Sequence, residues 1–341
     1  MYNVGIVGLG FLGGSLAKSL SKLDIVDKII AYDTNLESLK NAKNDGVITD
    51  YAEKIDDKFY DADVVFICTP VKLIPGIAME LEKVVNENCI ITDTGSTKKS
   101  IIEYSKNMNR EFIGGHPMIG SERSGYDTSK DFLFENAYYI ITKSEKTTDK
   151  SIGILTKLID GIRAIPIVLD ENRHDHITAS ISHVPHIVAA SLVNMVKELD
   201  DEDEMMKCLA AGGFKDITRI ASSDPTMWES ICSENKDEIL SILAKFKEKI
   251  SEFEDRISDT SKLYDFFSSS KKYRDSFASR KVDGNNMPEL NVSIKDENGA
   301  IAKIATLLSE NDIGIKNIEV MNNRENNFGV LKLIVRNYEE R

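Results

Sequence analysis

The chain has 341 residues, a formal net charge of −13 at pH 7 and a hydrophobic content of 41%. This length exceeds what one ordinary core supports, so we expect two or three domains. The apolar content excludes wholesale disorder, and the acidic balance argues against a nucleic-acid or anionic-membrane surface as partner.

Three further absences point to a cytoplasmic protein. The sequence contains no run of about 18 consecutive apolar residues, the length needed to span a bilayer. The N-terminus, MYNVGIVGLG, lacks the basic region of a signal peptide. The four cysteines are widely spaced and form no C-x-x-C motif, as expected in a reducing compartment.

β-rich runs alternate with helical patterns through about residue 168, which predicts an α/β domain with a parallel sheet covered on both faces. The helical pattern after the first strand spans 11–23, and the predicted strands are 3–7, 28–32, 63–68, 89–92 and 137–142. This region, 1–168, is the expected Rossmann-type dinucleotide-binding domain.

A change in periodicity marks a second, all-helical domain at 169–277. Long stretches at 177–199 and 238–267 carry apolar residues at helical spacing on one face, so we expect a dimer interface there. Residues 278–288 are polar and turn-rich and predict a linker. The third module, 289–341, predicts a strand (290–295), a helix (300–310) and two more strands (315–321 and 328–335).

A glycine-rich turn follows the first strand and opens the first helix. It reads Gly8-Leu9-Gly10-Phe11-Leu12-Gly13, and Asp33 ends the second strand 20 residues after the last of these glycines. The glycines permit a tight turn and close approach of a pyrophosphate, and the helix N-terminus attracts its charge. The Asp33 carboxylate suits ribose hydroxyls and repels a 2′-phosphate, so NAD is favoured. The alternative is a glycine turn in a non-binding α/β domain.

Two segments after predicted strands carry candidate catalytic groups. Ser96 lies in DTGSTK, where it either serves the chemistry or caps the following helix. His116 lies in GGHPMIGSE, flanked by glycines and proline, and we expect it in a loop. An imidazole can accept a proton at neutral pH, although a surface-loop histidine and a solvated Glu122 are the plainer alternatives.

Four of the five histidines cluster within 13 positions: His174, His176, His183 and His186. His183 and His186 share a helical face if Pro185 is tolerated there. Packing histidines and a metal site are the alternatives; we expect no metal, because no cysteine or evident carboxylate joins the cluster. Further on, Lys215 and Arg219 are four residues apart and suit a carboxylate substrate, whereas a surface ion pair with Asp216 is the simpler reading.

Taken together, these segments resemble the prephenate dehydrogenase family of tyrosine biosynthesis. The motifs GLGFLGGS, DTGSTK, GGHPMIGSE, SHVPH and GGFKDITRIA occur in the family's order over about residues 1–277. The resemblance implies NAD-dependent oxidative decarboxylation of prephenate to 4-hydroxyphenylpyruvate. Arogenate, the amino-acid analogue, is the alternative substrate.

The resemblance also implies roles for particular residues. It makes His116 the catalytic base, assisted by Ser96, and it makes Arg219 the ligand of a substrate carboxylate. His186 and His183 would orient the substrate, Lys215 and Asp216 would shape the pocket, Glu122 would gate it, and Trp228 would lie nearby.

The C-terminal module resembles an ACT domain, with DENG at 296–299 where that family has its ligand-contacting turn. The family's second helix and fourth strand do not follow the strand ending near Val335. The module raises two possibilities: a tyrosine effector for the enzyme, and a nucleotide- and amino-acid-sensing protein without turnover. A sensor would need neither Ser96 nor His116.

Overall fold

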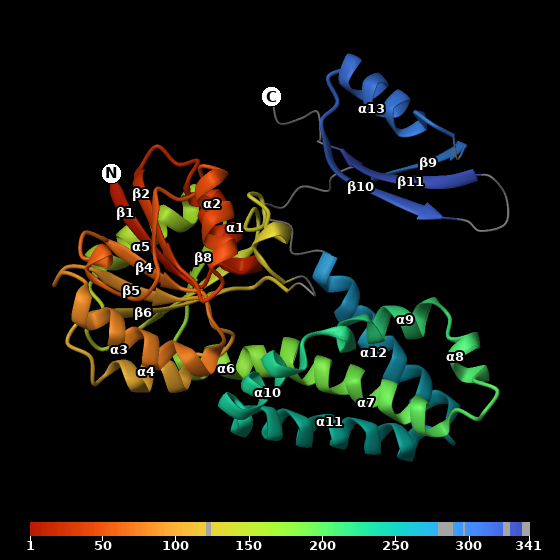
Figure 1. Ribbon diagram of the computed structural model, residues 1–341. Coiled ribbons are helices and arrows are strands. Elements are labelled where there is room, and N and C mark those ends of the chain that lie inside the picture. The colour runs from red at the N-terminus through yellow and green to blue at the C-terminus, as the bar shows by residue number, and fades with distance from the viewer. Residues whose placement is uncertain (121–123, 279–288, 296, 323–327, 336–341) are drawn as a thin grey trace. The chain divides into compact units, whose positions relative to one another are not determined.

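The computed structural model of the chain describes residues 1–120, 124–278, 289–295, 297–322 and 328–335 (Figure 1). It divides into two compact units, Met1–Ile250 and Ser251–Arg341, which are considered separately below.

An eight-stranded sheet forms the centre of the first unit, in the order β3-β2-β1-β4-β5-β6-β7-β8. The strands are β1 (Tyr2–Val7), β2 (Val26–Tyr32), β3 (Asp50–Ala52), β4 (Val64–Ile67), β5 (Ile90–Asp93), β6 (Glu111–Pro117), β7 (Tyr138–Lys143) and β8 (Ile165–Val168). The predicted parallel sheet is correct for β1 to β6 but wrong at one end, because β7 is antiparallel to β6 and β8 runs parallel to β7. The carboxyl ends of β1, β4, β5 and β6 therefore meet at one edge.

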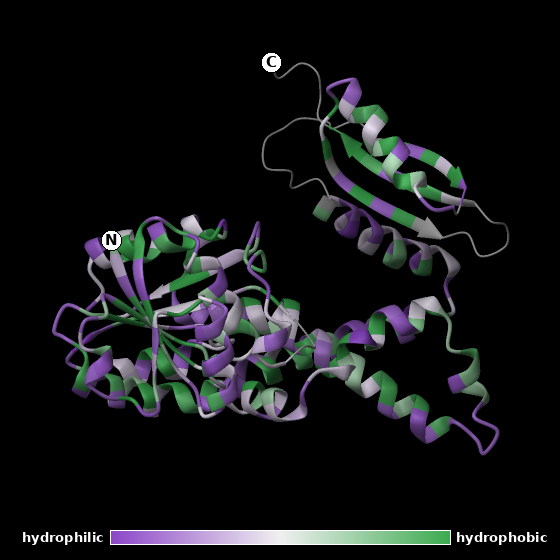
Figure 2. Cartoon of the chain, turned by 45° about the horizontal axis from the view of Figure 1, so that its top comes forward, coloured by the Kyte–Doolittle hydropathy of each residue, from purple (hydrophilic) through white to green (hydrophobic). Residues whose placement is uncertain are grey.

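Helices cover both faces of this sheet, as the strand–helix alternation predicts. One face packs against α1 (Phe11–Leu20), α2 (Leu36–Asn44) and α5 (Asp149–Gly161), and the other against α3 (Ile74–Val84) and α4 (Lys99–Ser105). The central strands β4 (VVFI) and β5 (IITD) are buried along their whole length. Figure 2 shows hydrophobic segments in both the strands and the helices of this unit. Continuous burial is characteristic of parallel strands with helices on both sides.

The rest of the first unit is helical. It contains α6 (Glu171–Thr178), a π-helical turn (Ala179–His183), α7 (Val184–Leu199), α8 (Met205–Leu209), α9 (Gly212–Thr218), a 3-10 turn (Arg219–Ser222), α10 (Pro225–Glu234) and most of α11 (Lys236–Arg256). The predicted helix at 177–199 is thus split by the π-helical turn. Ala179 and Val184 pack with Ile239 of α11 in a small core.

The segment Glu171–Leu199 is long and apolar enough, by length and composition, to cross a membrane. It contains the π-helical turn and four of the chain's histidines. Part of its apolar surface remains exposed, including Val193, Met195 and Leu199. Such a face fits the expected contact with a second copy of the chain.

The second unit contains α12 (Thr260–Ala278) and a three-stranded antiparallel sheet, ordered β10-β11-β9, with one helix. The elements are β9 (Glu289–Lys295), α13 (Ala300–Glu310), β10 (Ile315–Asn322) and β11 (Phe328–Val335). Leu331, Leu333 and Val335 of the central strand β11 are buried against Ile304 and Leu308 of α13. The predicted strand–helix–strand–strand order is confirmed, whereas the predicted linker falls, beyond its first residue, outside the described residues.

Candidate active site

The glycine-rich turn has the backbone geometry that dinucleotide binding requires. Gly8 adopts φ +94°, and a Cβ on it would lie 2.5 Å from the Cys68 carbonyl oxygen. A Cβ on Gly13 would lie 1.9 Å from the Gly8 carbonyl oxygen, so neither position accepts a side chain. At Gly10, which precedes α1, a Cβ would have no atom within 4 Å. The turn is therefore tight where the chain packs on itself and open where a phosphate would approach.

Asp33 holds the end of β2 against this turn. One carboxylate oxygen accepts a hydrogen bond from the Leu9 amide (2.5 Å) and the other from the Asn35 amide (2.7 Å). Its negative charge therefore lies beside the turn, where it disfavours a 2′-phosphate.

His116 is on a strand, so the prediction that it lies in a loop is wrong. It is the sixth residue of β6, opposite Ile140 of β7, and is 8% exposed. The preceding glycines belong to the same strand, and only glycine fits at Gly115, because a Cβ there would lie 2.3 Å from the Asp93 carbonyl oxygen. A Cβ on Gly114 would similarly lie 2.9 Å from the Lys98 side chain.

A buried ion pair supports this end of the sheet. Lys98 and Asp93 are both 0% exposed, and the lysine Nζ lies 2.5 Å from Asp93 Oδ2. The Asp93 carboxylate also accepts hydrogen bonds from the amides of Gly95 (2.8 Å) and Gly115 (2.9 Å). Asp93 thus connects the segment that carries Ser96 to the strand that carries His116. Both partners lie within the DTGSTK motif, but their pairing is not evident from the sequence.

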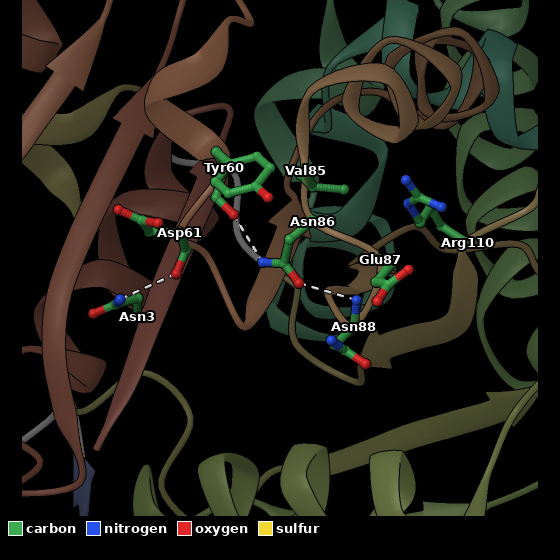
Figure 3. Close-up of a pocket in the computed structure, with 8 residues that line it drawn as sticks. All are labelled: Asn3, Tyr60, Asp61, Val85, Asn86, Glu87, Asn88 and Arg110. Carbon is green, nitrogen blue, oxygen red and sulfur yellow. Dashed lines mark hydrogen bonds between the residues drawn. The ribbon is translucent and has the colours of Figure 1, made fainter.

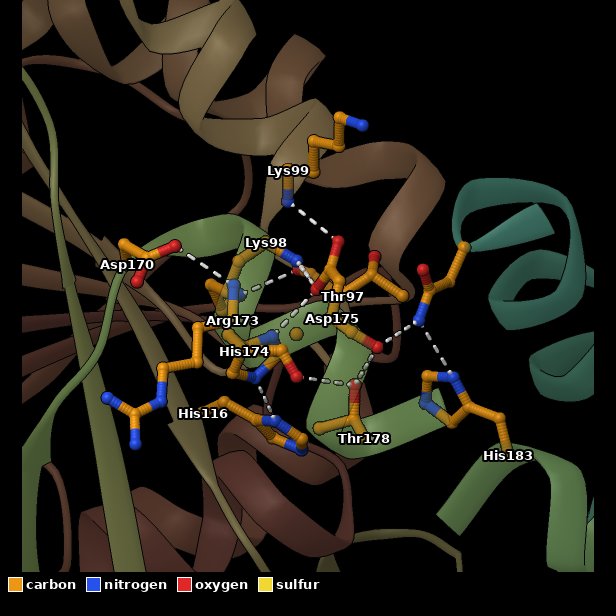
Figure 4. Close-up of polar contacts among 12 residues, drawn as sticks. Thr97, Lys98, Lys99, His116, Asp170, Arg173, His174, Asp175, Thr178 and His183 are labelled. Carbon is orange, nitrogen blue, oxygen red and sulfur yellow. Dashed lines mark hydrogen bonds and ion pairs between the residues drawn. The ribbon is translucent and has the colours of Figure 1, made fainter. Parts of the chain in front are cut away.

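His116 has a hydrogen-bond partner from the helical region (Figure 4). Its Nδ1 lies 2.7 Å from Nε2 of His174, and Nδ1 of His174 lies 2.7 Å from Oδ1 of Asp175. Both partners belong to α6. From the sequence, His174 was named only as a member of the histidine cluster. Asp175 was not identified, although its position directly after a histidine was an available signal.

Ser96 does not cap a helix, so that alternative is wrong. The following helix, α4, begins at Lys99, and the Asp175 carboxylate accepts hydrogen bonds from the amides of Lys98 (2.8 Å) and Lys99 (3.0 Å). Among the described residues, Ser96 makes no hydrogen bond to His116. Ser96 instead lines a hollow of about 90 Å³ together with Leu12 of the glycine-rich turn and residues of α10. The hollow places Ser96 beside the expected cofactor site.

The predicted shared face of His183 and His186 is supported by their common contact with Trp228. The His186 ring stacks on the indole at a centroid distance of 4.0 Å, and the His183 ring meets it edge-on at 6.0 Å. The π-helical turn ends immediately before α7, whose first turn contains Pro185. Such turns occur frequently at functional sites and accommodate local departures from α-helical bonding. Asn235, also missed, places its Nδ2 3.2 Å from Nδ1 of His183.

The cationic residues are placed differently from the histidines. Lys215 and Asp216 are exposed on α9, and Arg219 is exposed at the start of the 3-10 turn. The helix changes type at Arg219, so Lys215 and Arg219 do not share one continuous α-helix. Glu122 lies outside the described residues. Across those residues, no group of three or more His, Cys, Asp or Glu side chains is arranged to hold a metal ion.

Burial favours the neutral form of three histidines, His116, His174 and His183. Loss of hydration, with the neighbouring His174, Lys98 and His183, holds the pKa of His116 well below its usual value. Burial also lowers the pKa of His174 and that of His183, the latter to about 4. Burial alone would raise the pKa of Asp175, but hydrogen bonds from His174 and two backbone amides bring it below its usual value. A neutral imidazole beside an ionised carboxylate is the resulting state.

The low pKa of His183 predicts a loss of stability in acid. The unfolded chain binds this proton near pH 6.5 and the folded chain only near pH 4. The contribution of neutral His183 to the free energy of unfolding is complete above pH 6.5, and it falls by about 3 kcal/mol as the pH drops from 6.5 to about 4. Urea unfolding at pH 7 and pH 4 measures it. In His183→Gln, the free energies of unfolding at pH 7 and pH 4 should differ less than they do in the parent. An equal difference in parent and variant would contradict the assignment.

A larger hollow, of about 560 Å³, lies near the amino-terminal ends of the strands, at the opposite edge of the sheet (Figure 3). Its side chains bind nearby backbone: Asn86 Nδ2 donates to the Tyr60 carbonyl (2.7 Å), and Asn3 Nδ2 donates to the Asp61 carbonyl (3.0 Å). Ligands of open α/β sheets bind at the carboxyl ends of strands, so this hollow is not the candidate site.

Comparison with known proteins gives consistent matches. The family described as "Prephenate dehydrogenase, nucleotide-binding domain" matches residues 16–168, and "Prephenate dehydrogenase, dimerization domain" matches residues 170–269. A prephenate dehydrogenase of Bacillus subtilis (strain 168) is 36% identical, over 98% of this chain and 92% of that protein.

Solved structures are also similar to the chain, including the two that follow. The crystal structure of prephenate dehydrogenase from A. aeolicus, in complex with hydroxyphenyl propionate and NAD+, has a TM-score of 0.77 and 33% identity. The match covers 81% of this chain and 98% of the A. aeolicus chain. Arogenate dehydrogenase from Synechocystis has a TM-score of 0.73 and 26% identity, with coverage of 81% and 99%.

Proposed function

Because this chain belongs to the prephenate dehydrogenase family, we propose that it oxidises prephenate with NAD to give 4-hydroxyphenylpyruvate, carbon dioxide and NADH. One observation carries the proposal. Ser96 lines a hollow with Leu12 of the glycine-rich turn, and the neighbouring strand β6 carries, near its carboxyl end, a buried histidine held by a second histidine. A structural glycine turn would not require a buried histidine pair at the same sheet edge.

The residues at the turn fit a dinucleotide. Gly8, Gly10 and Gly13, with Phe11 and Leu12, would face the pyrophosphate, and Asp33 would accept hydrogen bonds from the ribose hydroxyls. When bound here, NAD supplies the hydride acceptor.

His116 acts as the general base. Its neutral imidazole accepts the proton of the substrate's 4-hydroxyl while hydride leaves the ring carbon that bears this hydroxyl. The ring carboxylate departs as carbon dioxide, and the electrons of that broken bond complete the aromatic ring. The protonated His116 then returns its proton to the ring oxygen, which gives the phenol of the product. Positioned bases of this kind contribute about 10²–10⁴ in rate. The Nδ1 of His116 is engaged by His174 and not by Ser96. Ser96 would therefore orient the substrate's 4-hydroxyl rather than the imidazole.

The remaining residues serve substrate binding. Arg219 would hold a carboxylate through its two-pronged guanidinium, with Lys215 adding positive charge. His186 and His183, arranged around Trp228, would orient the ring. Glu122 is proposed as the pocket's gate from the family resemblance.

Arg219→Ala is expected to raise KM for prephenate by about 10- to 100-fold, because hydrogen bonds between charged groups are worth about 1.5–3 kcal/mol. Steady-state rates across a prephenate series measure the change. Lys207→Ala, which removes an exposed cation from α8, is the control and should leave KM unchanged. An unchanged KM in Arg219→Ala would remove this residue from the substrate site.

The central test follows NADH absorbance with prephenate and with arogenate, and compares kcat/KM for the two. Faster turnover of prephenate supports the proposal. Preference for arogenate would favour the second candidate, which the similarity to the Synechocystis enzyme motivates. Binding of nucleotide without NADH formation from either substrate would favour a sensor.

We further propose a cytoplasmic homodimer built through 169–277, with 1–168 binding the nucleotide and 289–341 acting as an ACT-like module for tyrosine. The match to a dimerisation domain and the exposed apolar residues of α7 support the first part. Deletion of 289–341 should abolish tyrosine inhibition and preserve catalysis. Persistent inhibition in the shortened chain would place tyrosine at the active site.

A further inference from the structure

A chain of three buried side chains leads away from the proposed base. His116, His174 and Asp175 are 8%, 0% and 1% exposed, and their ring and carboxylate atoms are joined by two contacts of 2.7 Å (Figure 4). Buried polar groups are costly unless each finds a partner, so the direction of every hydrogen bond in this chain matters.

The direction follows from the groups at the far end. The Asp175 carboxylate accepts hydrogen bonds from the amides of Lys98 and Lys99, and backbone amides can only donate. An ionised carboxylate only accepts, so Nδ1 of His174 must carry the proton shared with Asp175. In neutral His174, Nε2 is then an acceptor. Nδ1 of His116 must donate to it, and Nε2 of His116 is left without a proton.

We propose that His174 and Asp175 are positioning residues that hold His116 in the tautomer whose bare Nε2 receives the substrate's hydroxyl proton. This inference rests on the proposed function. In isolated neutral imidazole either nitrogen can carry the proton, and the wrong tautomer presents a donor where the reaction needs an acceptor. The hydrogen bonds from His116 to His174 and from His174 to Asp175 fix the tautomer of His116 before substrate binds.

The backbone around the pair is fixed independently. Asp170 caps α6 by accepting a hydrogen bond from the Arg173 amide (2.9 Å). The Thr178 hydroxyl donates to the carbonyls of His174 (3.1 Å) and Asp175 (3.2 Å), and Asn235 Nδ2 donates to the Asp175 carbonyl (2.9 Å). The side chains of the pair therefore start from a fixed helix, as a positioning role requires.

Asp175 also contacts the segment that follows Ser96. Its carboxylate supplies the acceptor for the first amides of α4, where no residue of the preceding loop provides a side-chain cap. The same carboxylate thus orients His116 through His174 and holds the loop of Ser96 through the helix start. Both proposed catalytic groups depend on one side chain of α6.

Asp175→Ala tests the proposal by removing the acceptor for Nδ1 of His174. Asparagine would not remove it, because Oδ1 of Asp175 accepts from both the Lys98 amide and His174 Nδ1, and an asparagine oxygen placed there keeps both contacts. Without the carboxylate, His174 can carry its proton on Nε2, and His116 is then protonated on its own Nε2. We expect kcat to fall by about 10²-fold, because both the proton position and the orientation of His116 are lost, with the Kd of NAD within threefold of the parent. Asp170→Ala is the matched control, because it removes an aspartate that caps α6 but does not contact His174 or His116.

The tautomer can be observed directly. With ¹⁵N-labelled histidine in the full-length protein, the two ring nitrogens give different signals when protonated and unprotonated, and His116→Asn identifies the signals of residue 116. We expect a bare Nε2 in the parent and a signal of protonated Nε2 in Asp175→Ala. A protonated Nε2 in the parent, or a folded Asp175→Ala protein with kcat within threefold of the parent, would overturn the proposal.

His174→Phe provides a second variant that keeps the Asp175 contacts with α4. It removes the acceptor for His116 and should lower kcat to a similar extent, and parental kcat in this variant would also overturn the proposal. If the parent oxidised neither prephenate nor arogenate, the proposed function would fail. The ¹⁵N signals of residue 116 would still decide whether the pair sets the tautomer.

Discussion

His116→Asn is expected to lower kcat for prephenate oxidation by about 10²–10⁴-fold, because asparagine cannot accept and retain the hydroxyl proton. The Kd of NAD should stay within threefold of the parent, since no predicted NAD-contacting residue changes. NADH absorbance under saturating substrate gives kcat, and an equilibrium titration gives the Kd. His176→Asn is the matched control: that histidine belongs to the helical cluster, and its side chain is 49% exposed and pairs with Glu238.

The pH profile gives an independent test of the same assignment. Protonation inactivates a base, and the pKa of His116 is held well below its usual value by burial and by the neighbouring His174, Lys98 and His183. The acidic limb of kcat/KM should therefore lie below pH 6.5, with a flat profile through neutrality. A limb centred above pH 7, or near-parental kcat in His116→Asn, would eliminate this residue as the base.

Asp93→Asn is expected to cost about 3–5 kcal/mol of unfolding free energy. The substitution leaves the ammonium of Lys98 fully buried without its counter-charge. The asparagine nitrogen would also face a donor, because the carboxylate accepts from Lys98, Gly95 and Gly115. Urea unfolding at pH 7, followed by a signal from the first unit, measures the loss.

A double substitution separates charge burial from general damage. Asp93→Asn combined with Lys98→Met removes both charges and should recover most of the stability lost in the single variant. Glu103→Gln is the control for an exposed pair with Lys106, and it should cost less than about 1 kcal/mol. A cost below 1 kcal/mol for Asp93→Asn, or no recovery in the double variant, would show that the pair is not a structural charge pair.

Local pattern predicted most of the elements but not their pairing. The helix at 300–310 and the strand at 328–335 were predicted with the observed bounds, because their periodicity and turn residues are local signals. The strand β6 was missed, since Gly114, Gly115 and Pro117 are poor strand formers. The segment forms a strand through its pairing with β5 and β7, and the close approach of Asp93 and Lys98 leaves room only for glycine at positions 114 and 115.

The sequence by itself determined the alternation of strands and helices, the glycine-rich turn and the identity of the reactive side chains. These features depend on near neighbours: hydrophobic period, glycine conformation and the chemistry of each residue. Only the tertiary structure decided that His116 lies within a strand, that Asp175 rather than Ser96 supplies the acceptor for α4, and that His174 is the hydrogen-bond partner of His116. Those partners are far apart in the chain, and a hydrogen bond between them forms only when packing of the sheet and helices brings their atoms within about 3 Å.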